Sequence, residues 1–311
     1  MPAQPVRKAV FPVAGFGTRF LPMTKASPKE MLPIVDKPLI QYAVEEAAAA
    51  GITQMIFITG RGKRNIEDHF DKAYELEAEL AAHGKEELLK QIQSVIPDNL
   101  SFTYTRQVEQ RGLGHAVLCA QPLVGNEPFV VILADDLIDA ERPAIRQLLD
   151  IYEEHACSVI GMQSVPPEDT KQYGIISGSE LAPRLYSLDG IVEKPDPADA
   201  PSNFGVVGRY VFTPEIFEVL AQTTPGKGDE IQLTDAIETL RRQGSPIRAY
   251  AFEGERYDCG SKLGYLCATV DYGLRHPDLG EAFARYLGVN LPYTPHRIPV
   301  DDPGAGGTSI L

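Results

Sequence analysis

The sequence has 311 residues, of which 43% are hydrophobic and 23% are charged, so it can bury one sizeable core and is not globally disordered. Its formal net charge is −14, which argues against general nucleic-acid binding and means that any phosphate site must be built locally. It shows neither a signal-peptide pattern nor an apolar run of the ~20 residues that cross a bilayer, so we expect a cytoplasmic protein with no membrane partner.

Short apolar runs alternate with amphipathic stretches in the first half of the chain. The pattern predicts strands at residues 8–13, 54–59, 101–105, 129–133 and 159–163, and helices at 39–50, 116–120 and 144–154. This order favours an α/β fold with a Rossmann-like mixed, mostly parallel central sheet flanked by helices. The loops after its strands should meet at one edge of the sheet.

The second half is less regular and predicts a smaller β-rich region. The predicted strands are 174–178, 185–192, 206–212 and 247–252, and the predicted helices are 214–221, 233–243 and 262–275. The charged segment at about 64–96 predicts two or three helices inserted at the sheet edge. We expect one domain over residues 1–290 and a flexible tail over 291–311, where Gly and Pro gather.

A glycine-containing turn follows the first predicted strand. Gly15 and Gly17 let backbone amides approach a phosphate closely, and Arg19, Lys25 and Lys29 add positive charge within one Pro-rich segment. The third glycine of a dinucleotide fingerprint is missing, which counts against a nicotinamide dehydrogenase. We interpret the segment as a phosphate-binding loop.

Carboxylates follow two apolar strands that lie far apart in the sequence. Asp135 and Asp136 come directly after the strand at 129–133, and Asp258 follows the strand at 247–252. Ligands bind at the carboxyl ends of strands in open α/β sheets, and Mg²⁺ prefers one or two carboxylates plus phosphates and water. Helix capping and turn formation are the alternative roles for these side chains.

Several segments in a fixed order resemble a known family. They are residues 15–19, 29–33, 36–38, 112–116, 192–195, 229–235 and 257–260. Together they resemble the signature of the sugar-1-phosphate nucleotidylyltransferases, and in particular the bacterial UTP–glucose-1-phosphate uridylyltransferases. The resemblance implies transfer of a uridylyl group from UTP to glucose 1-phosphate, giving UDP-glucose and pyrophosphate, with Mg²⁺ as cofactor and a homodimer or homotetramer as the assembly.

The resemblance also implies a set of site residues, including a sugar-binding role for the β-rich region. The nucleotide residues would be Ala14, Gly15, Gly17, Thr18, Glu30, Gln107 and Gly112. The sugar phosphate would be bound by Gly174, Glu193, Lys194 and Asn203. The catalytic residues would be Arg19, Lys29, Asp135, Lys194 and Asp258, with Asp135 and Asp258 as the metal ligands.

Two further functions stay open beside this one. One is a related enzyme that uses dTTP or another sugar. Thymine differs from uracil by one methyl group, whose burial is worth only ~1 kcal/mol, so the base preference is not fixed by the sequence. The insertion at 64–96 argues against a dTTP enzyme. A non-catalytic regulatory homologue that binds sugar nucleotides would be free to lose its charged residues. Lys29, Asp135, Lys194 and Asp258 are all present, which argues against that function.

Overall fold

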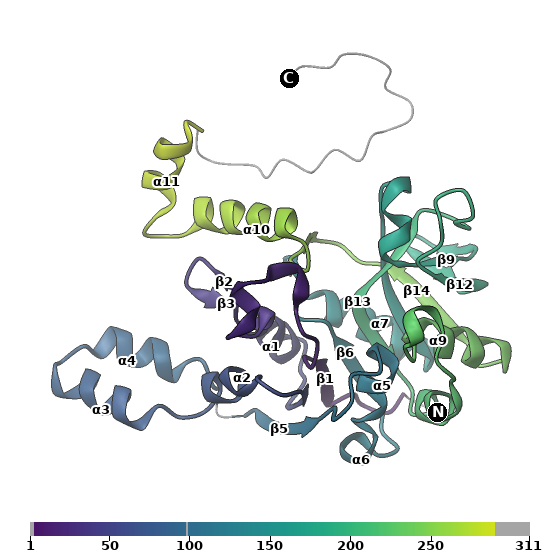
Figure 1. Cartoon of the computed structure of the whole chain (residues 1–311), viewed down its shortest axis with the longest axis horizontal. Helices are drawn as coiled ribbons and strands as arrows, with labels where there is room; N and C mark the ends of the chain where they lie inside the picture. The colour runs from purple at the N-terminus through teal and green to yellow at the C-terminus, as the bar shows by residue number, and fades with distance from the viewer. Residues whose placement is uncertain (1–2, 98, 290–311) are drawn as a thin grey trace.

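The computed structural model describes residues 3–97 and 99–289, and within them one eleven-stranded sheet forms the centre of the molecule (Figure 1). Along the sheet, the strands are β10 (Glu180–Ala182), β11 (Leu185–Ser187), β14 (Ile247–Ala251), β8 (Ser158–Ser164), β13 (Phe204–Phe212), β6 (Phe129–Ile132), β1 (Lys8–Pro12), β4 (Gln54–Thr59) and β5 (Ser101–Arg106). A short branch from β13 adds β9 (Gly174–Ser177) and β12 (Gly190–Glu193).

The sheet is mixed and mostly parallel, as predicted. Strands β5, β4, β1 and β6 run parallel, and β14 runs parallel to β8. Strand β13 lies antiparallel between β6 and β8. The carboxyl ends of β1, β4 and β6 therefore open at the same edge, which is where the predicted site residues begin.

Near-continuous apolar runs explain why the central strands pair in this way. In β1 and β4, Val10 and Ile56 belong to the core on one face, while Phe11 and Phe57 belong to the core on the other. The rings of Phe11 and Phe57 stack with centroids 4.9 Å apart. Strands buried on both faces need apolar side chains at successive positions.

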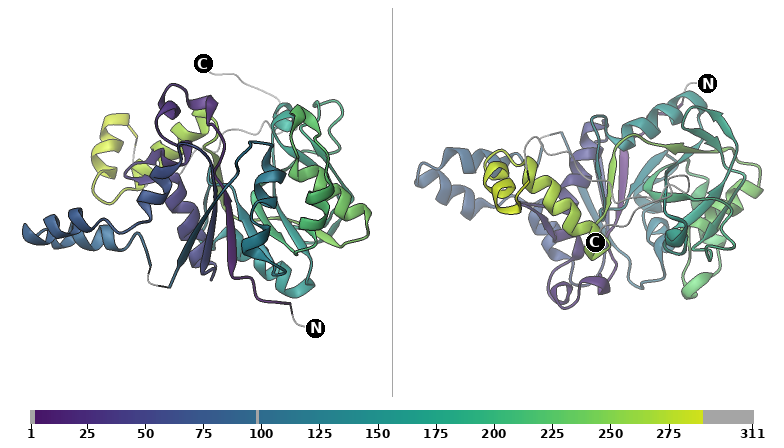
Figure 2. Two further views of the ribbon diagram at one scale, coloured as in Figure 1. Left: turned by 60° about the horizontal axis from the view of Figure 1, so that its bottom comes forward. Right: turned by 90° about the horizontal axis from the view of Figure 1, so that it is seen from above.

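Helices cover both faces of the sheet (Figure 2). One face is covered by α1 (Leu39–Ala49), α2 (Arg64–His69) and α7 (Ala144–His155). The other is covered by α5 (Leu113–Leu118), α6 (Gln121–Val124), α8 (Ile216–Gln222) and α9 (Leu233–Arg242). Helices α10 (Lys262–Arg275) and α11 (Gly280–Leu287) end the described chain.

The charged segment between β4 and β5 forms three helices, in agreement with the prediction. After α2, helices α3 (Tyr74–Ala82) and α4 (Glu86–Gln93) pack against each other as a hairpin that projects from the sheet edge (Figures 1 and 2). Two small sheets complete the fold. They pair β2 (Pro33–Ile34) with β3 (Lys37–Pro38) and β7 (Asp136–Asp139) with β15 (Glu255–Asp258).

The structure corrects two predicted elements. The strand predicted at 185–192 is two strands, because the chain turns where the Ser187 hydroxyl donates to Asp189, and β11 and β12 then pair with different neighbours. The helix predicted at 116–120 begins earlier, at Leu113, directly after Gly112.

The basic loop contains short 3-10 helices at Thr18–Phe20, Met23–Lys25 and Lys29–Met31. The predicted tail at 291–311 lies outside the described residues.

No helix within residues 3–97 and 99–289 combines the length and the apolar character needed to cross a membrane.

Candidate active site

Two adjoining cavities open near the carboxyl ends of β1 and β6. We name each cavity after the ligand predicted for its lining residues. The nucleotide-side cavity has a volume of about 450 Å³ and is lined by Ala14, Gly15, Gly17, Thr18, Lys29, Gln107, Gln110 and Gly112, among others. The sugar-side cavity has a volume of about 230 Å³ and is lined by Arg19, Tyr173, Gly174, Glu193, Lys194, Thr234, Arg256 and Asp258, among others. Leu113, Leu133, Asp135 and Glu230 line both. All of the predicted nucleotide residues except Glu30 therefore line the same cavity.

The backbone of the nucleotide-side cavity requires a glycine at position 112. Its φ is +96°, a conformation that L side chains rarely adopt, and a Cβ there would lie 2.7 Å from the Cβ of Glu230. The carbonyl of Gly112 accepts a hydrogen bond from Gln107 Nε2 at 3.0 Å. Gln107 is thereby held in the wall, with its Nε2 also 3.0 Å from His115 Nδ1.

Lys29 and Asp135 form an ion pair where the two cavities meet. Lys29 Nζ lies 2.5 Å from Asp135 Oδ2. Burial opposes the ionisation of Asp135, but the Lys29 charge and hydrogen bond outweigh it and hold the pKa of Asp135 below its usual range. Burial likewise opposes the charge on Lys29, and Asp135 outweighs it, so the pKa of Lys29 is raised. Both groups are charged at neutral pH.

The pairing of β7 with β15 places Asp258 near Asp135. Asp136, the neighbour of Asp135, lies opposite Asp258 in that pair, and the Cys259 N–H donates to the Asp135 carbonyl at 2.8 Å. Gly260 leaves room between the two carboxylates. A Cβ at Gly260 would lie 2.9 Å from Asp135 Oδ2 and 2.9 Å from Asp258 Oδ1. The two predicted metal ligands therefore face one small space, which Arg19 Nη1 also borders, 3.2 Å from the same point.

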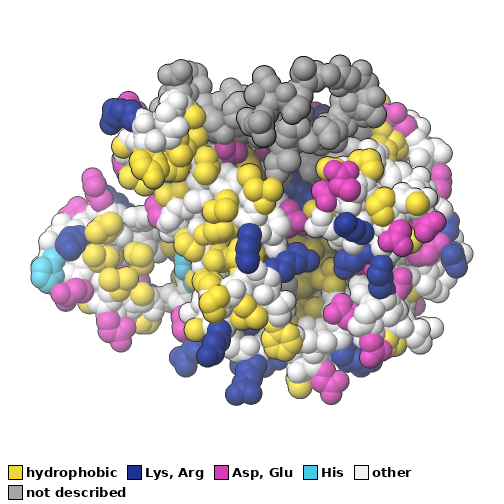
Figure 3. All heavy atoms as spheres, turned by 45° about the horizontal axis from the view of Figure 1, so that its top comes forward, with side chains coloured by type: hydrophobic (Ala, Val, Ile, Leu, Met, Phe, Trp, Pro, Cys, Tyr) yellow, Lys and Arg dark blue, Asp and Glu magenta, His cyan; other side chains and the backbone are white. Residues whose placement is uncertain are grey.

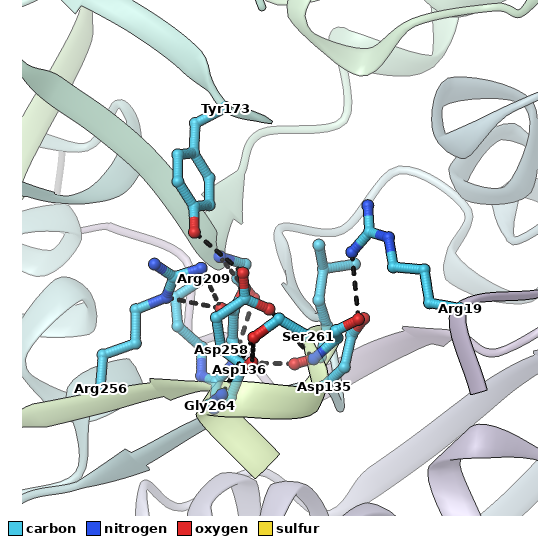
Figure 4. Close-up of polar contacts among 12 residues, drawn as sticks. Arg19, Asp135, Asp136, Tyr173, Arg209, Arg256, Asp258, Ser261 and Gly264 are labelled. Carbon is cyan, nitrogen blue, oxygen red and sulfur yellow. Dashed lines mark hydrogen bonds and ion pairs between the residues drawn. The ribbon is translucent and has the colours of Figure 1, made fainter. Parts of the chain in front are cut away.

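A buried network surrounds this space (Figure 4). Arg256 pairs with Asp136 at 2.5 Å, and the other oxygen of Asp136 accepts from the Gly208 N–H at 2.8 Å. Arg209 donates to the carbonyls of Leu133 and Asp136 on either side of Asp135. Asp136 is buried and both of its oxygens are bonded within the protein, whereas Asp135 and Asp258 are partly exposed to the cavity.

The sugar-side wall presents a carboxylate and an amine together. Glu193 ends β12, and its Oε1 lies 2.8 Å from Lys194 Nζ. The Thr234 hydroxyl donates to the other oxygen, Oε2, at 2.9 Å. Gly174 lies opposite Glu193 in the β9–β12 pair. A carboxylate held in this way can accept hydrogen bonds from sugar hydroxyls, and the amine can pair with a phosphate.

Two predicted residues, Glu30 and Asn203, line neither cavity, whereas Arg19 lies at the site on the side of Asp258. Glu30 is 2% exposed and lines neither cavity, because its Oε2 pairs with Lys63 Nζ at 2.8 Å. Asn203 is exposed, also lines neither cavity, and donates to the Ser164 hydroxyl. Arg19 lines the sugar-side cavity, where it donates to the Gly260 carbonyl at 3.2 Å.

Several polar residues that line the cavities were not among the predicted site residues. They include Gln110, Tyr173, Glu230, Thr234 and Arg256. Glu230 and Thr234 belong to the 229–235 segment, which the resemblance includes without giving either residue a role. Arg256 precedes Asp258 by two residues, and a cation beside a predicted metal ligand was a usable signal. Gln110 donates to the Ala14 carbonyl at 2.6 Å and had no signal beyond its loop position.

The donor set fits a divalent ion that substrate phosphates help to hold. The described residues contain no group of three or more His, Cys, Asp or Glu side chains placed to hold a metal by themselves. Asp135 and Asp258 supply two carboxylates beside the open space at Gly260, and the Lys29 ammonium already places a cation against Asp135. Two carboxylates completed by phosphate and water oxygens are typical of Mg²⁺ sites.

Cations lie at the site despite the acidic composition. Figure 3 shows Lys and Arg side chains around a hollow on one face of the molecule. Among the described site residues, Arg19, Lys29, Lys194 and Arg256 line the two cavities, together with carboxylates such as Asp135 and Glu193. These cations can contact phosphates locally even though the net charge is −14.

The class of the protein follows from comparison with known families. The model of the family described as Nucleotidyl transferase matches residues 8–273, which is most of the chain. The chain belongs to this nucleotidyl transferase family. Members of the family generally use a divalent metal ion.

Relatives within the family narrow the class further. The chain is 52% identical to the UTP–glucose-1-phosphate uridylyltransferase of Pseudomonas aeruginosa, over 85% of this chain and 95% of that protein. It is 53% identical to a Bacillus subtilis enzyme of the same name, over 91% of this chain and 94% of that protein. These relatives confirm the expected resemblance to the bacterial UTP–glucose-1-phosphate uridylyltransferases.

Solved structures agree with this placement. A UDP-glucose pyrophosphorylase complexed with UDP-glucose matches with a TM-score of 0.80 and 49% identity, over 86% of this chain and 98% of that chain. A UTP-bound enzyme of the same type from Acinetobacter baumannii matches with a TM-score of 0.84 and 42% identity, over 91% and 99%.

Proposed function

We propose that the chain catalyses the transfer of a uridylyl group from UTP to glucose 1-phosphate, with UDP-glucose and pyrophosphate as products. The observation that carries this proposal is the junction of two cavities at Asp135. One cavity has the glycine turn and Lys29 of a nucleotide site, and the other has the Glu193–Lys194 pair of a sugar-phosphate site. A transferred phosphoryl group would sit where the cavities meet.

The reaction is a direct in-line displacement. An oxygen of the glucose 1-phosphate attacks the α-phosphorus of UTP, a new P–O bond forms, and the bond to the β-phosphate breaks with its electron pair leaving on pyrophosphate. The attacking oxygen is already ionised near neutral pH, so no general base is required. Alignment and charge neutralisation are the main tasks of the protein.

The side chains divide these tasks. Lys29 pairs with the triphosphate and the leaving pyrophosphate, and Arg19 adds positive charge at the same junction. Lys194 holds the phosphate of the sugar substrate, and Glu193 accepts hydrogen bonds from sugar hydroxyls. Gln107 and the backbone around Gly112 form the site for the uracil base.

Asp135 and Asp258 are the proposed ligands of a divalent ion, which we take to be Mg²⁺. When bound there, such an ion supplies positive charge to the α-phosphate as the negative charge redistributes in the transition state. The role of the protein is to keep the two carboxylates oriented toward the same space beside Gly260.

Chromatography of the reaction mixture tests this function. We expect UDP-glucose and pyrophosphate in equal amounts from UTP and glucose 1-phosphate. Asp135→Asn should lower kcat by about 100-fold or more, because charge stabilisation at the reacting phosphorus is lost. Asp199→Asn, which removes an exposed carboxylate outside both cavities, is the matched control. An active Asp135→Asn enzyme would contradict the proposed site.

We further propose a homodimer or homotetramer, on the basis of the family resemblance. Analytical ultracentrifugation of the full chain distinguishes these assemblies from a monomer.

A further inference from the structure

Tyr173 connects the sugar-side wall to Asp258. It lies between the 3-10 helix Pro167–Gln172 and β9, and its backbone carbonyl accepts a hydrogen bond from the Lys194 N–H at 2.9 Å. Its side-chain hydroxyl donates a hydrogen bond to Asp258 Oδ2 at 2.8 Å (Figure 4). Tyr173 therefore contacts both Lys194, which is proposed to bind the sugar phosphate, and Asp258, which is a proposed metal ligand.

The surroundings of Tyr173 fix its ring in this position. The Arg256 guanidinium lies over the ring, 4.8 Å from its centroid. Arg256 is itself held by Asp136, and both side chains of that pair are about nine-tenths buried, with exposures of 9% and 10%.

The hydroxyl determines how Asp258 presents its two oxygens. With Oδ2 bonded to Tyr173, the other oxygen, Oδ1, accepts the Gly260 N–H at 3.0 Å. Oδ1 is also the oxygen that faces the open space shared with Asp135. Without the Tyr173 hydroxyl, the Asp258 carboxylate would keep only the hydrogen bond from the Gly260 N–H, and it could rotate away from that space.

We propose that Tyr173 is a positioning residue that orients Asp258 for the divalent ion and couples ion binding to occupation of the Lys194 loop by the sugar phosphate. This inference rests on the proposed role of Asp258 as a metal ligand. Coupling between two binding sites is reciprocal. Glucose 1-phosphate should therefore raise the affinity for the ion, and the ion should raise the affinity for glucose 1-phosphate.

Mn²⁺ binding measured by electron paramagnetic resonance tests the proposal without turnover, because UTP is left out. In the unsubstituted protein, glucose 1-phosphate should tighten Mn²⁺ binding by about 5-fold or more, within the usual range of coupling between sites. Tyr173→Phe keeps the ring over Arg256 and removes the hydroxyl. We expect it to weaken Mn²⁺ binding by about 10-fold, as for loss of one charge-assisted hydrogen bond, and to abolish the effect of glucose 1-phosphate.

Tyr152→Phe is the matched control, because it removes a hydroxyl that donates to the Gln4 carbonyl at 3.0 Å, outside both cavities. It should leave Mn²⁺ binding unchanged. Mn²⁺ binding by Tyr173→Phe equal to that of the unsubstituted protein would overturn the positioning role and leave the uridylyl transfer standing. If Asp258→Asn also binds Mn²⁺ normally, the metal role of Asp258 fails and the inference fails with it.

Discussion

At the scale of single residues, the charges of the site are paired within the protein. Lys29 pairs with Asp135, Lys194 pairs with Glu193, and Arg256 pairs with Asp136. The Lys194 side chain is 40% exposed, so it can leave a carboxylate for an incoming phosphate, whereas the Arg256 pair is buried and stays in place. The partly exposed Lys194–Glu193 pair can therefore serve binding, and the buried Arg256–Asp136 pair serves to hold the site together.

Lys194→Met should separate binding of the two substrates. Loss of a charge-assisted contact costs about 2 kcal/mol, so the KM for glucose 1-phosphate should rise by about 30-fold. The KM for UTP should change little. Steady-state kinetics with each substrate varied in turn measures both values. Lys171→Met, an exposed lysine that lines neither cavity, is the control. An equal rise in both KM values would contradict the assigned role.

The buried pair of Glu30 with Lys63 should matter for stability. Glu30→Gln leaves the Lys63 cation buried without an anionic partner, and breaking such a pair costs about 3 kcal/mol. Replacing both residues together, as Glu30→Leu with Lys63→Met, should restore most of the loss, because no charge remains to be buried. Urea unfolding measures each variant, and additive losses in the double variant would argue against a coupled pair.

At the scale of elements, pairing of distant segments builds the site. Strands β7 and β15 bring Asp135 close to Asp258, although more than a hundred residues separate them in the sequence. The segment 227–234 has a similar function between the cavities: the Ile231 carbonyl accepts from Gly114, and the Thr234 hydroxyl holds Glu193. Through this segment, hydrogen bonds link the walls of the two cavities.

Helix α9 should contribute stability that depends on pH. A hydrogen bond from Arg241, helped by one from Arg242, lowers the pKa of Glu238 and outweighs the opposing effect of burial. A carboxyl whose folded pKa is lowered stabilises the fold above its unfolded pKa of ~4.3, and this contribution is lost as the pH falls through the folded pKa. Glu238→Gln should cost about 0.5 kcal/mol at pH 7, because the pair is partly exposed. Urea midpoints should converge below about pH 4; a constant difference would contradict the assignment.

The helical hairpin α3–α4 should be dispensable for substrate binding. Its helices pack mainly against each other, and no residue of the hairpin lines either cavity. Replacing residues 74–93 with a short Gly-Ser linker should therefore leave the KM values for UTP and glucose 1-phosphate within about 2-fold, since loop length alone costs little. A folded but inactive deletion variant would show that the hairpin supports the site.

At the scale of the whole molecule, the sequence predicted the main sheet well and the site only in part. The apolar runs of β1, β4 and β6 made those strands clear, and α10 was predicted at its observed bounds. The position of Glu30 could not be predicted, because its partner Lys63 lies 33 residues away and the pairing depends on the tertiary fold. The same holds for the β7–β15 pair, whose short strands carry charged residues at their ends.

The most direct test of the central claim measures pyrophosphate release by the purified protein with Mg²⁺, offering UTP or dTTP together with glucose 1-phosphate. We expect release that requires both UTP and glucose 1-phosphate, that favours UTP over dTTP, and that EDTA abolishes. A preference for dTTP would overturn the base assignment. Absence of release with every nucleotide, combined with tight UDP-glucose binding, would contradict catalysis itself.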